Sequence, residues 1–157
     1  MRRLVGGVAW LGLCVGCSDH ASVLEPGLWT LEVHTYSGFT GRLIRDWSVE
    51  GAGDARLSFG DVNGEVTERC EGTLDAAAIA ALTDTMNDLD VLGRDDSVAN
   101  GADFDRNVYL IRATGGDAAG DENEFIDEVG AALRLGTQIE GLTRAQGQCM
   151  AVMTSAP

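Results

Sequence analysis

The chain has 157 residues, of which 45% are hydrophobic and 23% are charged. This balance is enough to bury one core of ordinary size, and it argues against wholesale disorder. The 25 acidic residues outnumber the 11 basic ones, all of which are arginine, so the formal net charge is −14. A negative field of this size repels phosphate backbones and anionic lipid headgroups, so nucleic acid is not expected as a partner.

Residues 1–16 have the pattern of a secretory signal peptide. Arg2 and Arg3 precede an apolar run from Leu4 to Val15, and a small residue follows it. A run of about twelve residues is too short to cross about 30 Å of hydrocarbon as a helix, which distinguishes a cleaved signal from a membrane span. We therefore expect residues 1–16 to be removed and the remaining chain to be exported.

The segment Leu13–Cys17 resembles the signal of bacterial lipoproteins, in which a small residue precedes a cysteine that becomes acylated. It departs from that pattern at Cys14, where the family usually has leucine. The resemblance implies that Cys17 carries the lipid, that residues 17–28 form a tether, and that Ser18 favours the outer membrane. The alternative is cleavage elsewhere, with Cys17 lost or left as a free thiol.

The number of cysteines supports a lipid on Cys17. Removing the leader leaves Cys17, Cys70 and Cys149, an odd number in an oxidising compartment, where a spare thiol is unfavourable. Acylation of Cys17 leaves Cys70 and Cys149 as one pair. A disulfide between them would close a loop of about 80 residues and stabilise the fold by roughly 4 kcal/mol. The alternative is two buried free thiols.

A single domain is predicted over residues 29–150, with residues 151–157 as a tail. Its first half alternates apolar and polar residues, and glycine-rich turns interrupt the alternation. Four strands are predicted: Trp29–Val33, Arg42–Val49, a short strand with Leu57 and Phe59, and Glu65–Cys70. Tight turns between consecutive strands are typical of an antiparallel meander.

The spacing of apolar residues then changes from that of a strand to that of a helix. Ile79, Leu82, Met86 and Leu89 fall on one helical face. Thr73 is the predicted N-cap, with Asp75 in the first turn and the helix ending before Gly93.

The second half of the domain is predicted to add strands and one more helix. Asn107–Ile111 is almost continuously apolar, which favours a central strand covered on both faces. Gly115–Asn123 is predicted as an acidic loop and Glu124–Ile126 as a short strand, and Leu135, Ile139 and Leu142 indicate a second helix. The expected fold is α+β, an antiparallel meander sheet packed against two helices.

No catalytic, cofactor-binding or metal-binding residues are predicted. The two histidines are His20, in the tether, and His34, which is expected to be exposed. Asp103–Asn107 begins like a calcium loop, but Val108 stands where that loop requires glycine and Thr114 where it requires a bidentate glutamate. The acidic residues Asp121, Glu122 and Glu124 are interpreted as part of a solvated loop, with adventitious calcium binding as the alternative.

Four short segments together resemble the emfourin-like proteins, a family that includes inhibitors of thermolysin-type metallopeptidases. They are Tyr36–Gly41, the helix with Ile79, Leu82 and Leu89, Gly101–Asp103 leading to Tyr109–Ile111, and the closing helix. The chain departs from the family by having Phe39 where a second glycine is frequent, and by its cysteine pair and leader. The resemblance implies a small α/β fold and an inhibitory role, and no contact residue is carried over from it.

The sequence thus favours a non-enzymatic envelope lipoprotein that binds another protein, such as a metallopeptidase, through an exposed loop or edge strand around Gly38–Gly41. One alternative is a passive structural or surface protein of the envelope. The other is a hydrolase that uses carboxylates alone, which requires two acidic side chains in a deep cleft.

Overall fold

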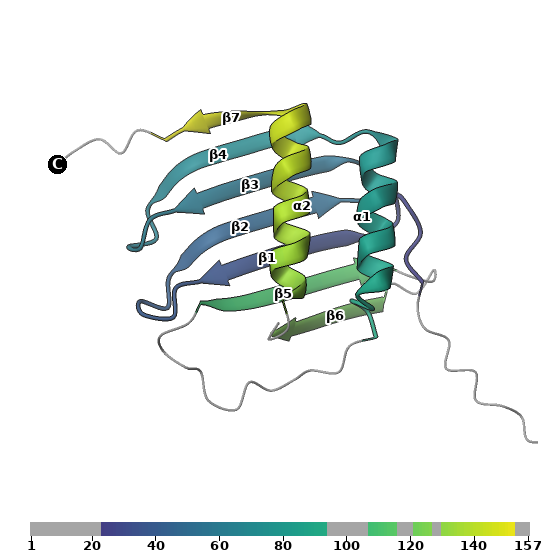
Figure 1. Cartoon of the computed structure of the whole chain (residues 1–157), viewed down its shortest axis with the longest axis horizontal. Helices are drawn as coiled ribbons and strands as arrows, with labels where there is room; N and C mark the ends of the chain where they lie inside the picture. The colour runs from purple at the N-terminus through teal and green to yellow at the C-terminus, as the bar shows by residue number, and fades with distance from the viewer. Residues whose placement is uncertain (1–22, 94–106, 116–120, 127–129, 153–157) are drawn as a thin grey trace, which may run out of the picture.

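The protein folds as an antiparallel sheet with two helices on one of its faces (Figure 1). The computed structural model describes residues 23–93, 107–115, 121–126 and 130–152. In chain order the elements are β1 (Thr30–Tyr36), β2 (Leu43–Glu50), β3 (Asp54–Gly60), β4 (Val66–Thr73), α1 (Ala76–Asp88), β5 (Val108–Gly115), β6 (Asp121–Ile126), α2 (Ala131–Gln146) and β7 (Gly147–Ala151). No described helix has the length and apolar character needed to cross a membrane.

The sheet has seven strands in the order β6-β5-β1-β2-β3-β4-β7, and every neighbouring pair is antiparallel. The first four strands form the predicted meander. The later strands add to both of its sides, β5 and β6 beside β1 and β7 beside β4. The predicted fold class, a meander sheet packed against two helices, is confirmed.

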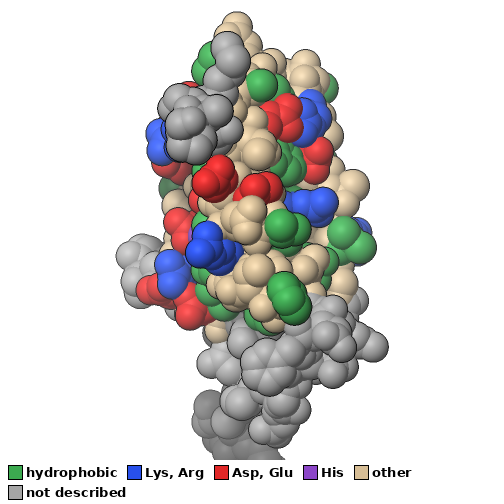
Figure 2. Space-filling view, turned by 90° about the vertical axis from the view of Figure 1, so that its left-hand side faces the viewer, with side chains coloured by type: hydrophobic (Ala, Val, Ile, Leu, Met, Phe, Trp, Pro, Cys, Tyr) green, Lys and Arg blue, Asp and Glu red, His purple; other side chains and the backbone are tan. Residues whose placement is uncertain are grey.

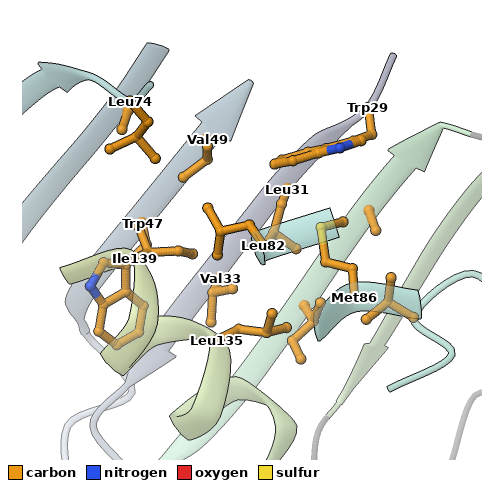
Figure 3. Close-up of a cluster of buried hydrophobic side chains, with 14 of the residues drawn as sticks. Trp29, Leu31, Val33, Trp47, Val49, Leu74, Leu82, Met86, Leu135 and Ile139 are labelled. Atoms are coloured by element: carbon orange, nitrogen blue, oxygen red, sulfur yellow. The ribbon is translucent and has the colours of Figure 1, made fainter. Parts of the chain in front are cut away.

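The core lies between the sheet and the two helices (Figure 3). Alternate residues of the strands point toward α1 and α2, as the period of two predicts. The largest fully buried side chains include Leu31, Val33, Trp47 and Val49 from the sheet, Leu82 and Met86 from α1, and Leu135 and Ile139 from α2.

Gly136 allows α2 to lie directly on the sheet. A Cβ atom at this position would be 2.9 Å from Cη2 of Trp47, closer than such contacts occur. By helix propensity alone, a glycine at this position would weaken α2 by up to about 1 kcal/mol relative to alanine. In the fold, the missing side chain of Gly136 leaves room for the indole ring of Trp47 to pack against α2.

The predicted N-cap of α1 is wrong by two residues. Asp75, not Thr73, caps the helix, because its Oδ1 accepts a hydrogen bond of 2.8 Å from the Ala78 backbone N–H. Thr73 is the last residue of β4. Both residue types suit an N-cap, so the choice between them depended on where β4 ends.

Within the described part of the chain, helices cover the apolar strand β5 on one face only, and not on both faces as predicted. Both helices lie on one face of the sheet (Figure 1), and β5 is separated from one sheet edge only by β6. Ile111 and Ala113 are buried beneath the helices, whereas Val108 and Leu110 point to the helix-free face and are half-buried. The first half of β5 is continuously apolar because Val108 and Leu110, which lie on the helix-free face, are apolar as well.

Two further boundaries differ from the sequence prediction. The predicted acidic loop Gly115–Asn123 is partly strand, because β6 begins at Asp121. The predicted tether 17–28 is shortened by Leu24, which is 2% exposed and exchanges hydrogen bonds with the side chain of Asn87. The folded domain therefore includes Leu24.

Candidate functional site

Two turns lie side by side at one end of the sheet, and together we call them the hairpin end. They are the β1–β2 turn, residues 37–42, and the β3–β4 turn, residues 61–65. In a meander, alternate turns fall at the same end, and Figure 1 shows both at the left. Thr40 Oγ1 donates a hydrogen bond of 3.1 Å to the carbonyl of Val62, and the Arg42 guanidinium donates one to the carbonyl of Asn63.

The β1–β2 turn is held by its own backbone and by Ser37. Ser37 N–H donates to the carbonyl of Arg42 at 2.8 Å, and Gly41 N–H donates to the carbonyl of Ser37 at 2.6 Å. Ser37 Oγ also accepts a bond of 3.2 Å from Thr40 N–H. Gly41 has φ +64°, a left-handed conformation that glycine adopts without strain. These bonds fix the position of the residue between them, Phe39.

The β3–β4 turn is organised by the carboxylate of Asp61. Its Oδ1 accepts hydrogen bonds from the backbone N–H groups of Asn63 at 2.8 Å and Glu65 at 3.0 Å. The bond from Glu65 is the main reason why the pKa of Asp61 lies below its usual value. The carboxylate is therefore charged, and the turn keeps its shape, throughout the neutral range.

Gly64 permits the two turns to touch. A Cβ atom on Gly64 would lie 3.1 Å from Cβ of Arg42, tighter than most real contacts, and its φ of +78° also favours glycine. The aliphatic part of Arg42 lies against the second turn for this reason. The Asn63-Gly64 pair predicts a turn from the sequence, but not this contact.

The hairpin end exposes large apolar side chains, which Figure 2 shows from that side. Phe39 is 91% exposed, Val62 is 68% exposed and Leu43 is 37% exposed. An aromatic ring in water on a turn that is fixed by hydrogen bonds loses little conformational entropy on binding. Such a residue is suited to enter a pocket on a partner.

The hairpin end carries arginines beside its exposed apolar residues. Arg42 and Arg45 lie in and next to the first turn, and neither forms an ion pair with a carboxylate among the described residues. The Arg45 guanidinium lies 6.0 Å from the centre of the Trp47 ring. The hairpin end thus combines exposed apolar groups with charges of both signs, since Asp61 and Glu65 in the second turn balance the two arginines.

The hairpin end lies opposite the entry of the N-terminal segment. The described chain starts at Val23, on the right of Figure 1, while both turns lie on the left. Cys17, the predicted lipidation site, lies outside the described residues.

The structure places Cys70 and Cys149 together. Their sulfur atoms lie 2.04 Å apart, the length of a disulfide bond, as the sequence predicted. The unforeseen part is that Cys149 lies in a strand, β7, directly opposite Cys70 on β4. No strand pattern is visible in the sequence there, because all but the first residue of β7 are exposed.

His34 is not exposed as predicted. Its side chain is 17% exposed, with Nδ1 2.9 Å from Asp46 Oδ1 and Nε2 3.5 Å from Glu32 Oε2. The hydrogen bond to Asp46 raises the pKa of His34, burial lowers it, and the net shift is upward. Glu32 also pairs with Arg112, which pairs in turn with Glu124. This network, in which three carboxylates meet one guanidinium and His34, lies on the helix-free face.

Among the described residues, one group has the spacing of metal ligands, namely Glu68, Cys70 and Cys149. It does not suit a cation, because both cysteines are oxidised and Arg144 donates two hydrogen bonds to the carboxylate of Glu68. Asp103 and its neighbours up to 106 lie outside the described residues.

The helix-free face of the described chain carries shallow, open depressions. One holds about 390 Å³ and is lined by Asp54, Arg56 and Glu71 among others. Compared with models of known protein families and with curated protein sequences, the chain matches none.

Proposed function

We propose that this chain is a non-enzymatic lipoprotein of the bacterial envelope, anchored through Cys17, that binds another protein with its hairpin end. The observation that carries the proposal is Phe39, a 91% exposed aromatic ring on a turn fixed by hydrogen bonds on both sides. Exposed aromatic anchors of this kind supply much of the free energy of many protein interfaces.

The place of the hairpin end supports the same proposal. If Cys17 is held in a membrane, the six residues 18–23 give a tether of about 20 Å when extended, so Leu24 stays near the bilayer. The hairpin end lies at the other end of the strands and would face away from the lipid (Figure 1). A partner would reach it without contacting the membrane.

A metallopeptidase is the partner to test first, because the emfourin-like resemblance of Tyr36–Gly41 implies an inhibitory role. The purified chain is added to a panel of thermolysin-type enzymes, and peptide hydrolysis is measured. We expect inhibition that Phe39→Ala weakens by about tenfold or more, since truncation of an anchor removes on the order of 1.4 kcal/mol or more.

The matched control is Leu133→Ala. Leu133 is also an exposed apolar residue, at 56%, but lies on α2 and not at the hairpin end. Equal loss of inhibition in both variants would exclude the hairpin end as the binding surface, and no inhibition by the unchanged chain would exclude the peptidase partner. Mass spectrometry of the mature N-terminal peptide tests the lipid on Cys17 separately.

The two alternative functions lead to different results. A passive structural protein would alter envelope integrity when deleted, with no change caused by Phe39→Ala. A carboxylate-based hydrolase is not favoured by the open depressions of the helix-free face, since their acidic residues are not enclosed.

A further inference from the structure

The sheet has two edges, and they differ in how they discourage pairing with another chain. An edge strand offers unpaired backbone groups, and natural proteins usually protect it with charge, proline or a covering element. β6 carries Asp121, Glu122 and Glu124. β7, with the sequence GQCMA, carries neither charge nor proline, and no strand of the described chain lies beyond it.

The geometry of the disulfide shows which backbone groups of β7 point outward. Cys149 lies opposite Cys70 with their Cα atoms 4.0 Å apart, the short spacing of an antiparallel pair that exchanges no hydrogen bonds. Val152 N–H donates to the carbonyl of Thr67 at 2.8 Å, so the backbone N–H and C=O groups of the even-numbered residues point toward β4. The N–H and C=O groups of Cys149 and Ala151 therefore point away from the sheet.

β7 is also held in place before any partner arrives. The disulfide ties its centre to β4, and its start is continuous with α2, where Gly147 N–H donates to the carbonyl of Thr143. Gly72 and Gly147 make this close approach possible, since a Cβ on Gly72 would lie 2.7 Å from Cα of Gly147. An edge strand that is fixed at its start and its centre loses little conformational entropy when another strand pairs with it.

The sequence of β7 is complementary to itself in antiparallel pairing. With a two-fold axis at Cys149, Gln148 of one copy faces Met150 of the other, and Gly147 faces Ala151. No two like charges meet, whereas the same operation on β6 would crowd the acidic residues of both copies. Met150 is 65% exposed in the single chain and would be partly covered.

We propose that a second copy of this chain pairs with β7, strand to strand and antiparallel, so that the two sheets become continuous. The hydrogen bonds join the two Cys149 residues reciprocally and run from each Ala151 N–H to the Gly147 carbonyl of the other copy. Because β7 has five residues, the interface is small and the dimer is weak in solution. The proposal does not depend on what the hairpin end binds.

The experiment measures the mass of the full chain, solubilised in detergent, by sedimentation equilibrium up to about 1 mM, where even weak association is populated. Ala151→Pro removes one outward N–H and leaves the bonds to β4 intact, so it should weaken the dimer by about tenfold or more. Hydrogen exchange should show the Ala151 amide protected at high concentration and unprotected at low concentration.

A pair of double variants tests the register without proline. Gln148→Glu with Met150→Glu places like charges opposite each other and should weaken the dimer, whereas Gln148→Glu with Met150→Lys places opposite charges there and should restore it. A chain that is monomeric up to about 1 mM overturns the proposal. So does an association that neither Ala151→Pro nor the Glu/Glu variant weakens.

Discussion

The two edges of the sheet are attached to the same core in different ways. β7 is held by a covalent bond, Cys70–Cys149, and by its direct continuation from α2. β6 is held by its backbone pairing with β5 and, on the helix-free face, by ion pairs from Arg112 to Glu124 and Glu32, with His34 next in the network. The β7 edge should therefore be insensitive to salt and mild changes of pH, while the β6 edge should respond to both.

The largest expected effect comes from removing the covalent attachment. Cys70→Ala with Cys149→Ala opens a loop of 79 residues and should lower the free energy of unfolding by about 4 kcal/mol. Urea denaturation measures this loss. In this variant, hydrogen exchange should be accelerated more in β7 than in β6. Equal acceleration in both strands would contradict the view that the disulfide holds the β7 edge in particular.

A smaller effect is expected from pH, through His34 on β1 and its partner Asp46 on β2. The pKa of His34 is raised in the folded state, mainly by its hydrogen bond to Asp46, so its stabilising effect is complete below the unfolded pKa of about 6.5. It is lost as pH rises through the folded pKa. Denaturation at about pH 5.5 and about pH 8.5 should show lower stability at the higher pH.

Asp46→Asn is the control for the pH effect. It removes the main cause of the raised pKa, so the difference between the two pH values should shrink. If the unchanged chain were more stable at the higher pH, and Asp46→Asn left that trend unaltered, His34 would not be the responsible group.

The smallest effect is expected from Arg112→Gln. The Arg112 side chain is 43% exposed and its ion pairs are screened by solvent, so the stability loss should be slight and should vanish at high salt. Hydrogen exchange of β6 at about 0.05 M and about 1 M NaCl checks this. Acceleration of β7 instead would mean that the two edges are coupled.

Local pattern predicted the elements that lie within the first half of the domain. Alternation of apolar residues with glycine-rich turns predicted the meander, and the spacing of Ile79, Leu82 and Met86 predicted α1. These patterns are reliable because one face of each element is buried and the period of its side chains is then fixed. β7 left no such pattern, since nearly all of it is exposed.

The candidate surface was only partly visible in the sequence. Gly38–Gly41 was predicted as an exposed turn, and the structure confirms a turn with Phe39 in solvent. Val62 and the contact from Arg42 to the second turn were not predicted. Turn residues indicate where a chain reverses, but not which other turn it then touches.

The sequence by itself determined the class of fold, the pairing of Cys70 with Cys149 and the position of the first turn, because periodicity, parity and turn chemistry are local or countable. Only the tertiary structure decided that both helices cover one face, that His34 is enclosed by carboxylates, and that β7 forms an uncharged edge. These features depend on which strands become neighbours, and residues distant in the chain settle that order through long-range pairing.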